Sequence, residues 1–249
     1  DGRIYFTTGE HFNPPDAQSL SNPRGKVHRI NPDGTIPTDN PFYDGVGPNV
    51  DSVWALGLRN PFRAYFDAPT NRLLIGDVGG NDYSTAQEEV DVGARGANYG
   101  WPNCELGTCG NPAYTPAIYA YAHNGRDAAI TGGFVYHGSQ FPSAYQGSYF
   151  FADYSGNWIQ RMVFDANGNP AGVLPFATGL AAPCTLELGP DGMIYYLSFT
   201  TGQIRRIQFN GPVAVASASP TSGYSQLGVS FSSAGSSNPG GGALTFLWD

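Results

Sequence analysis

Charged residues are scarce in this sequence, and lysine is nearly missing. They make up 13% of the 249 residues, against about 25% in average proteins, and Lys26 is the one lysine. The formal net charge is −8. Binding of nucleic acid by counterion release requires clustered cations, and the adjacent pair Arg205 and Arg206 is too small for this purpose. We therefore expect no nucleic-acid partner, and an anionic membrane surface is an unsuitable partner for the same reason.

Long apolar runs and cysteines are scarce too. A stretch of about 20 apolar residues is missing, which argues against insertion into a bilayer. Cys104 and Cys109, two of the three cysteines, stand close together in a loop-rich segment. We predict a disulfide between them, typical of an oxidising compartment; zinc is the weaker alternative, because no second pair of ligands lies nearby. Cys184 is interpreted as a small buried apolar residue.

Glycine and proline, by contrast, are abundant, with 34 and 20 residues. Aromatic residues contribute 14% and hydrophobic residues 41% of the chain. A helical bundle would need Ala, Leu, Glu and Lys at high density, and a disordered chain would have fewer apolar residues. Short strands separated by Gly, Pro, Asn and Asp turns are typical of an all-β protein, which is the fold class that we predict.

One local pattern occurs four times within residues 1–209. It consists of a turn, a nearly continuous apolar run, a link that contains glycine, and a second run in which apolar and polar residues alternate. The apolar runs contain Ile4, Leu74, Phe150 and Tyr195. A continuous run is expected of a strand buried on both faces, and alternation of a strand with one exposed face. The pattern predicts about four blades of a six-bladed β-propeller, with these four residues on inner strands.

The composition changes after Phe209 to a stretch rich in Ser, Gly and Ala. Alternating runs predict three short half-buried strands there, around residues 213–215, 229–231 and 244–248. We expect residues 210–249 to form the first half of a β-sandwich domain after the propeller portion. Both ends of the sequence look like strand segments, so we interpret it as a piece of a longer chain.

An ordered series of motifs resembles the glucose/sorbosone dehydrogenase family. The motifs are GKVHRINPDGTIPTDNP (25–41), LGLRNPF (56–62), GDVG (76–79), EEVD (88–91), GANYGWP (96–102), AITGG (129–133) and FFADY (150–154). The resemblance implies a soluble, PQQ-dependent sugar dehydrogenase on a six-bladed propeller. The tail resembles the opening half of a PKD domain. The two modules are often joined in secreted bacterial proteins, so we expect an extracellular or periplasmic location.

The same resemblance implies cofactor-binding residues. Arg59 and Asn60 match residues that face the quinone PQQ, and His11 stands where the family has a glutamine. A guanidinium fork stabilises an oxygen that becomes anionic on reduction, and we therefore assign the catalytic role to Arg59. Without the family, Arg59 would be interpreted as a turn residue that satisfies backbone carbonyls.

Two calcium sites are implied as well. Gly79 and Gly80 fall where the family offers backbone carbonyls to the calcium that polarises PQQ. Glu89 and Tyr99 match a second site, with a carboxylate from the first and a carbonyl from the second. Hard oxygen ligands suit calcium rather than a transition metal. The alternative for Glu89 is an exposed strand glutamate.

The family pattern is not complete in this sequence. The family's base histidine corresponds to a position before Asp1, and Tyr154, Ala182 and Cys184 stand where a lysine and two arginines are expected. The function expected is calcium-assisted oxidation of an aldose or related sugar by hydride transfer to PQQ. A propeller that has lost PQQ and binds carbohydrate, such as a polysaccharide, or protein is the alternative.

A hydrolase or lactonase is the third possibility. Asp77 and Asp153 end inner strands, and paired carboxylates at the mouth of a propeller could serve hydrolysis with calcium. His123 and His137 could act as a base or as metal ligands, although their aromatic neighbours favour histidines that are simply packed.

Overall fold

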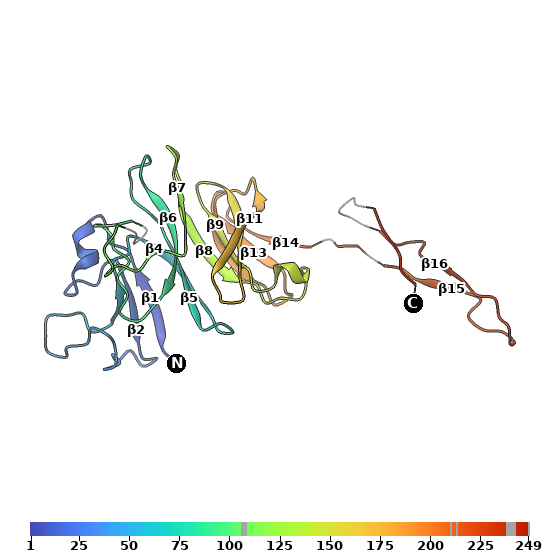
Figure 1. Cartoon of the computed structure of the whole chain (residues 1–249), viewed down its shortest axis with the longest axis horizontal. Coiled ribbons are helices and arrows are strands. Elements are labelled where there is room, and N and C mark those ends of the chain that lie inside the picture. The colour runs from blue at the N-terminus through green and yellow to red at the C-terminus, as the bar shows by residue number, and fades with distance from the viewer. Residues whose placement is uncertain (106–108, 210, 213, 238–242, 249) are drawn as a thin grey trace. The chain divides into compact units, whose positions relative to one another are not determined.

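The computed structural model describes residues 1–105, 109–209, 211–212, 214–237 and 243–248, and shows an all-β protein (Figure 1). Helix among these residues is limited to two short 3₁₀ turns, η1 (Pro14–Gln18) and η2 (Ser143–Tyr145). The chain divides into two compact units, Asp1–Ile207 and Gln208–Asp249. Within the described residues, no helix combines the length and apolarity that a membrane crossing needs.

The described part of the first unit forms four antiparallel sheets in chain order. The first contains β1 (Ile4–Thr8), β2 (Lys26–Ile30) and β3 (Val53–Leu56). The second contains β4 (Pro61–Asp67), β5 (Arg72–Asp77), β6 (Gln87–Gly93) and β7 (Tyr119–Ala122). The third contains β8 (Ile130–Val135), β9 (Tyr149–Asp153), β10 (Trp158–Phe164) and β11 (Pro170–Thr178). The fourth contains β12 (Pro183–Leu188), β13 (Ile194–Ser198) and β14 (Gln203–Ile207).

The predicted all-β fold and its hairpins are confirmed, but the innermost strands of the second, third and fourth sheets were assigned wrongly. The four apolar runs became β1, β5, β9 and β13, and each pairs with the alternating run that follows it. Neighbouring sheets, however, meet mainly through β4, β8 and β12, which precede the last three of those runs. The residues Leu74, Phe150 and Tyr195 therefore lie on second strands, whereas Ile4 lies on β1, the edge strand through which the first sheet contacts β4. Leu74 and Phe150 are buried because their strands are flanked by a strand on each side and covered by adjacent sheets.

Apolar side chains fill the spaces between successive sheets. Aromatic rings dominate the cluster between the third and fourth sheets, where Phe150 packs edge-on against Phe176 with ring centroids 4.8 Å apart. Phe134 and Ile194 lie in the same cluster and are almost fully buried. Each such side chain stabilises the fold by about 1.5–3 kcal/mol relative to an exposed one. This packing fixes the sheets whose ends carry the polar residues described below.

The lysine is buried at the start of β2. The Lys26 side chain is inaccessible to solvent, and its Nζ donates to the carbonyls of Asp16, Ala17 and Arg24 at 2.7, 3.0 and 2.5 Å. Burial lowers the pKa of Lys26 to about 8, although Asp16 opposes the shift. The ammonium thus ties η1 and the turn before β2 together.

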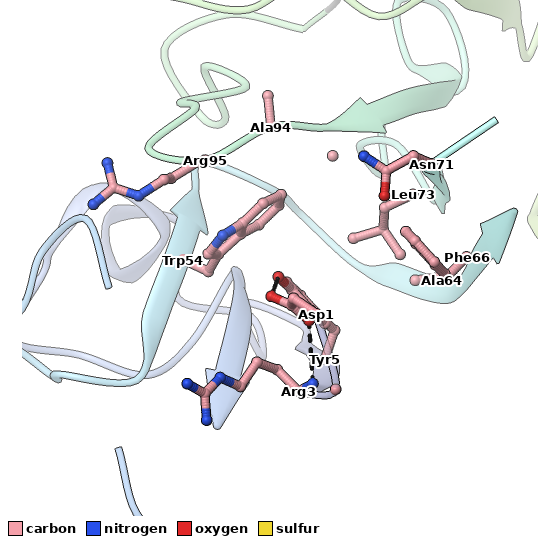
Figure 2. A pocket seen from close by; sticks show the side chains of 12 residues that line it. Asp1, Arg3, Tyr5, Trp54, Ala64, Phe66, Asn71, Leu73, Ala94 and Arg95 are labelled. Carbon is pink, nitrogen blue, oxygen red and sulfur yellow. Dashed lines mark hydrogen bonds between the residues drawn. The ribbon is translucent and has the colours of Figure 1, made fainter. Parts of the chain in front are cut away.

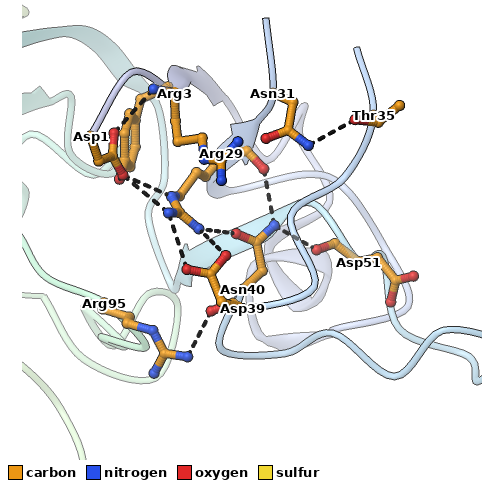
Figure 3. Close-up of polar contacts among 10 residues, drawn as sticks. Asp1, Arg3, Arg29, Asn31, Thr35, Asp39, Asn40, Asp51 and Arg95 are labelled. Carbon is orange, nitrogen blue, oxygen red and sulfur yellow. Dashed lines mark hydrogen bonds and ion pairs between the residues drawn. The ribbon is translucent and has the colours of Figure 1, made fainter. Parts of the chain in front are cut away.

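A second buried cation, Arg29, organises the long β2–β3 connection (Figure 3). Its Nη1 donates to Asp39 at 2.8 Å and to Asn40 at 3.0 Å, and its Nε donates to Asp1 at 3.1 Å. The hydrogen bond from Arg29 to Asp39 raises the pKa of Arg29. Asn40 in turn donates to the backbone carbonyls of Arg29 and Asp51, which closes the connection onto β2.

The second unit is a short two-stranded ladder. β15 (Ser217–Ser219) pairs antiparallel with β16 (Ser230–Ser232). The predicted third strand at 244–248 does not form, and the first lies at Ser217–Ser219, slightly after its predicted place; Val213 falls outside the described residues. Phe231 is 65% exposed and Leu247 93%. The described residues therefore provide no second layer to bury these side chains, and the PKD-like sandwich stays a prediction.

Candidate functional site

Two of the three predicted cofactor residues, Arg59 and Asn60, directly precede β4 and lie next to the end of β5. Asp77, the last residue of β5, is paired with Pro61 in the sheet and is buried. Its carboxylate accepts the backbone N–H groups of Arg59 at 3.0 Å and of Asn60 at 2.6 Å. A buried carboxylate thus fixes the backbone from which both predicted side chains project.

His11, Arg59 and Asn60 line one open cavity of about 300 Å³. The loop after β1 supplies His11, and the amide of Glu10 in that loop donates to the carbonyl of Arg59 at 2.7 Å. A guanidinium, an amide and an imidazole are donors that suit an anionic, oxygen-rich ligand, so this wall of the cavity fits PQQ. All three predicted cofactor residues are therefore brought together.

The Arg59 side chain is tied to the loop between β5 and β6. Its Nη1 donates to the carbonyl of Val78 at 3.1 Å and its Nη2 donates to Oδ1 of Asn81 at 2.7 Å. Because a guanidinium has five N–H donors, these two contacts orient the fork and still leave donors for a ligand. The turn role considered from the sequence and the cofactor role are thus compatible.

The Gly79–Gly80 turn is held by two carboxylates. The Gly79 N–H donates to Oε1 of Glu88 at 3.1 Å, and the Gly80 N–H donates to Oε1 of Glu105 at 2.7 Å. A Cβ atom on Gly79 would overlap the carbonyl oxygen of Gln87. Glycine is therefore required at position 79 by the close approach of two backbone segments.

Three buried carboxylates meet between β5 and β6. Asp77 is the cross-strand partner of Glu89, and Asp91 follows two residues later on the same face of β6. One oxygen from each residue lies within 4.8 Å of the other two. One ion could therefore sit at about 2.3–2.6 Å from all three oxygens, the range of calcium–oxygen bonds.

The buried negative charge of these three carboxylates would be stabilised by a cation. Both carboxylate oxygens of Asp91 are buried and have no hydrogen-bond partner among the described residues. Burial, followed by the charges of Glu89 and Asp77, raises the pKa of Asp91 well above its ordinary value. Burial also raises the pKa of Asp77 to about 7. A divalent ion would remove this cost, so the residues fit calcium.

The predicted metal residues lie around this cluster. Gly79, Glu89 and Tyr99 border, together with Asp77, a void of about 10 Å³, close to the size needed by one water or ion. Glu89 is buried rather than an exposed strand residue. Gly80 does not line this void, but its N–H donates to Glu105, which does.

Sequence reasoning missed Asp91 and Glu105 entirely. The Glu-Val-Asp alternation at positions 89–91 could have identified Asp91, because it places two acids on one face of a strand. Glu105 follows Cys104 in the loop that the disulfide with Cys109 closes; that bond is present, as predicted. Only the fold shows that Glu105 reaches Gly80.

The remaining candidates have structural contacts. His123 is buried and its Nε2 lies 2.7 Å from Glu88, and His137 Nε2 lies 2.6 Å from Asp67. Asp153 accepts hydrogen bonds from the Tyr121 hydroxyl and from the amides of Ala129 and Gly156. The geometry therefore does not favour Asp153 as half of a hydrolytic pair.

A larger cavity of about 550 Å³ lies elsewhere, between the first and second sheets (Figure 2). Trp54 and Tyr5 form one side, and Phe66, Leu73 and Asn71 the other. Phe66, Asn71 and Leu73 flank the β4–β5 turn, at the opposite end of β5 from Gly79. None of the predicted site residues lines this cavity.

The family resemblance of the sequence motifs was compared with a model of the whole family. The sequence model of the family described as glucose/sorbosone dehydrogenase matches residues 1–206. The chain belongs to this family. The membership covers nearly all of the first unit, which contains every residue of the candidate site.

Individual relatives agree with this membership. Quinoprotein glucose dehydrogenase B of Acinetobacter calcoaceticus is 34% identical over 143 residues, covering 50% of this chain and 28% of that protein. A solved structure from Thermus thermophilus, described as a putative oxidoreductase (glucose dehydrogenase), is 26% identical with a TM-score of 0.68, covering 82% of this chain and 60% of that one.

The PQQ-bound aldose sugar dehydrogenase of Streptomyces coelicolor has a similar structure. It is 24% identical with a TM-score of 0.64, covering 81% of this chain and 54% of that one. The chain spans about a third or less of the length of the Acinetobacter calcoaceticus relative and of two similar plant proteins from Arabidopsis thaliana. Its first unit thus has the fold of sugar dehydrogenases and belongs to a family of sugar oxidoreductases.

Proposed function

We propose that the chain is part of a secreted dehydrogenase that oxidises an aldose or related sugar, with PQQ as hydride acceptor and with calcium. The observation that carries the proposal is the convergence of His11, Arg59 and Asn60 on one cavity beside the Gly79–Gly80 turn. A PQQ-bound relative with the same fold and a quinoprotein relative support it.

The residues of this chain have distinct roles in the proposal. When bound, PQQ supplies a quinone that accepts a hydride. Arg59 presents a positive fork to the oxygen that gains charge, and its two contacts with the β5–β6 loop keep the fork oriented without rearrangement. Asn60 and His11 bind polar edges of the cofactor, and Asp77 holds the Arg59 and Asn60 backbone in place.

Calcium has two proposed positions. The Gly79 and Gly80 carbonyls would hold an ion shared with PQQ, whereas Asp77, Glu89 and Asp91 hold an ion without cofactor. The second ion neutralises three buried acids and bridges β5 and β6. The Cys104–Cys109 disulfide supports a secreted protein, because such bonds persist in oxidising compartments.

The proposal is tested on the full-length protein stripped of metal and then supplied with PQQ and calcium. Aldose-dependent reduction of an electron-accepting dye should appear only with both additions. Arg59→Ala should lower kcat/KM about 100-fold or more. Arg126→Ala is the matched control, since Arg126 is an exposed loop arginine, and should retain wild-type activity.

One observation favours a second function, a propeller that binds carbohydrate without PQQ. Tyr154, Ala182 and Cys184 provide no cations where the resemblance implies three, and each charge-assisted hydrogen bond contributes about 1.5–3 kcal/mol. Titration calorimetry with PQQ and with oligosaccharides separates the two functions. Oligosaccharide binding without any PQQ binding would replace the dehydrogenase proposal by this one.

A further inference from the structure

The structure assigns a positioning role to Glu105: we propose that its carboxylate sets the direction of the Gly79 carbonyl and so determines the affinity of the cofactor-linked calcium site. The inference rests on the proposed function, which places an ion at that carbonyl. It goes beyond that function because Glu105 itself need not touch the ion or PQQ.

The argument begins with the geometry of one peptide unit. Gly79 C=O and Gly80 N–H belong to the same planar trans peptide, so the two groups point in opposite directions. The Gly80 N–H is held by Glu105 at 2.7 Å. The Gly79 carbonyl must therefore face away from Glu105. Rotation of this peptide would break the bond to Glu105 and turn the carbonyl away from the ion.

The preceding peptide unit is fixed at both ends as well. The Gly79 N–H donates to Glu88, and the Val78 carbonyl accepts from Arg59. The Val78–Gly79 peptide is therefore held by Arg59 and Glu88, and the next peptide, Gly79–Gly80, is held by Glu105. Of these side chains, Glu105 is the one that holds the peptide containing the Gly79 carbonyl, the predicted cation ligand.

Glu105 is itself held from its own loop. The preceding residue, Cys104, is buried, its amide donates to the Gly100 carbonyl at 3.0 Å, and its sulfur is bonded to Cys109. The disulfide therefore limits how far Glu105 can move from Gly80. Loss of the disulfide should weaken the same calcium site through Glu105, although neither cysteine is a ligand.

The test uses the full-length protein and three variants of it. Two variants replace Glu105, and the third removes the disulfide. Calcium affinity is measured by titration calorimetry, with and without PQQ, for wild type, Glu105→Ala, Glu105→Gln and the Cys104→Ser/Cys109→Ser double variant. Glu187→Ala is the control, because Glu187 is an exposed acid on β12.

We expect Glu105→Ala to weaken PQQ-dependent calcium binding about tenfold or more, because it removes a charge-assisted hydrogen bond. Glu105→Gln keeps an acceptor oxygen and should remain within about threefold of wild type. Calcium binding without PQQ, assigned to Asp77, Glu89 and Asp91, should be the same in both. The double serine variant should also have a lower PQQ-dependent calcium affinity than wild type, as Glu105→Ala does.

Hydrogen exchange of the 78–82 segment separates this inference from the proposed function. If wild type binds no PQQ-dependent calcium, the proposed function fails. Faster exchange of the Gly80 amide in Glu105→Ala than in Glu105→Gln would still support the positioning of this peptide by Glu105. Wild-type calcium affinity and wild-type exchange in Glu105→Ala would overturn the inference. Equal loss of affinity in the alanine and glutamine variants would also overturn it, since charge would then matter instead of the hydrogen bond.

Discussion

Asp77 and Glu89 are cross-strand partners in the β5–β6 ladder, and both carboxylates are buried. Like charges placed opposite each other destabilise a sheet unless something compensates them. Asp91 adds a third acid to the same face of β6. The repulsion among these carboxylates therefore destabilises the sheet, and a bound cation would replace this repulsion by attraction.

Chelation should lower the melting temperature of the full-length protein. An ion present at 100 times its Kd contributes about 2.7 kcal/mol, which corresponds to about 5–10 °C for a unit of this size. Asp91→Asn should lose most of this calcium dependence, because it removes one charge without changing the size of the side chain. Differential scanning calorimetry in calcium and in chelator measures both effects. Asp127→Asn, at an exposed loop position, is the control, and identical wild-type curves in the two conditions would contradict the site.

Gly79→Ala should destabilise the protein and weaken PQQ-dependent calcium binding together. The new Cβ would overlap the Gln87 carbonyl, so one backbone segment must move, at a cost of about 1–3 kcal/mol. Gly172→Ala is the control, since the nearest atom to a Cβ there is 3.8 Å away. Chemical denaturation and calorimetry provide the measurements. A fully stable Gly79→Ala protein would show that the turn does not pack as described.

Glu88→Ala should be among the most destabilising single changes in the first unit. The carboxylate accepts from the amides of Gly79 and Ile130 and contacts His123, all in a buried environment. Removing one partner of a buried charged network costs about 3–5 kcal/mol. Urea denaturation should show this loss, with Glu88→Gln intermediate because it keeps one acceptor oxygen. A loss below about 1 kcal/mol would mean that water replaces the carboxylate easily.

Lys26 predicts a rise in stability with pH. Its pKa in the folded state is lowered to about 8, so between pH 8 and 10 the unfolded chain binds more protons than the folded one. The cost of the buried ammonium is fully present below pH 8 and is relieved above it, by about 1–2 kcal/mol at pH 9.5. Lys26→Met should remove this rise in denaturation curves measured from pH 7.5 to 9.5. An unchanged pH dependence in that variant would assign the rise to other groups.

The sequence was sufficient for the fold class and for selecting Arg59 and Asn60, which line one cavity, because those signals are local. Apolar runs followed by alternating runs identified the hairpins, and one short motif contained both Arg59 and Asn60. The innermost strands were missed because their patterns are mixed: Phe62 and Arg63 on β4 are both exposed in this chain. A strand with exposed aromatic and charged residues does not have the continuous apolar run expected of an inner position.

Contacts between distant residues account for the rest. Glu105 reaches Gly80 across 25 residues, and the Asp77–Glu89 pair depends on the register of a ladder that the sequence does not specify. The strand predicted at 244–248 was wrong for the opposite reason. Its alternating residues at 244–248 suggested a strand, but alternation alone does not supply a partner strand to complete the hydrogen bonds.

The buried ammonium of Lys26 also has a practical consequence for surface chemistry. Because residues 1–249 contain one lysine and its Nζ is enclosed by three carbonyls, amine-reactive reagents should find no accessible lysine side chain on this part of the protein. A single lysine introduced at an exposed position would become the one reactive lysine side chain within these residues. Attachment to an electrode or a label through that lysine would hold the first unit in one defined orientation.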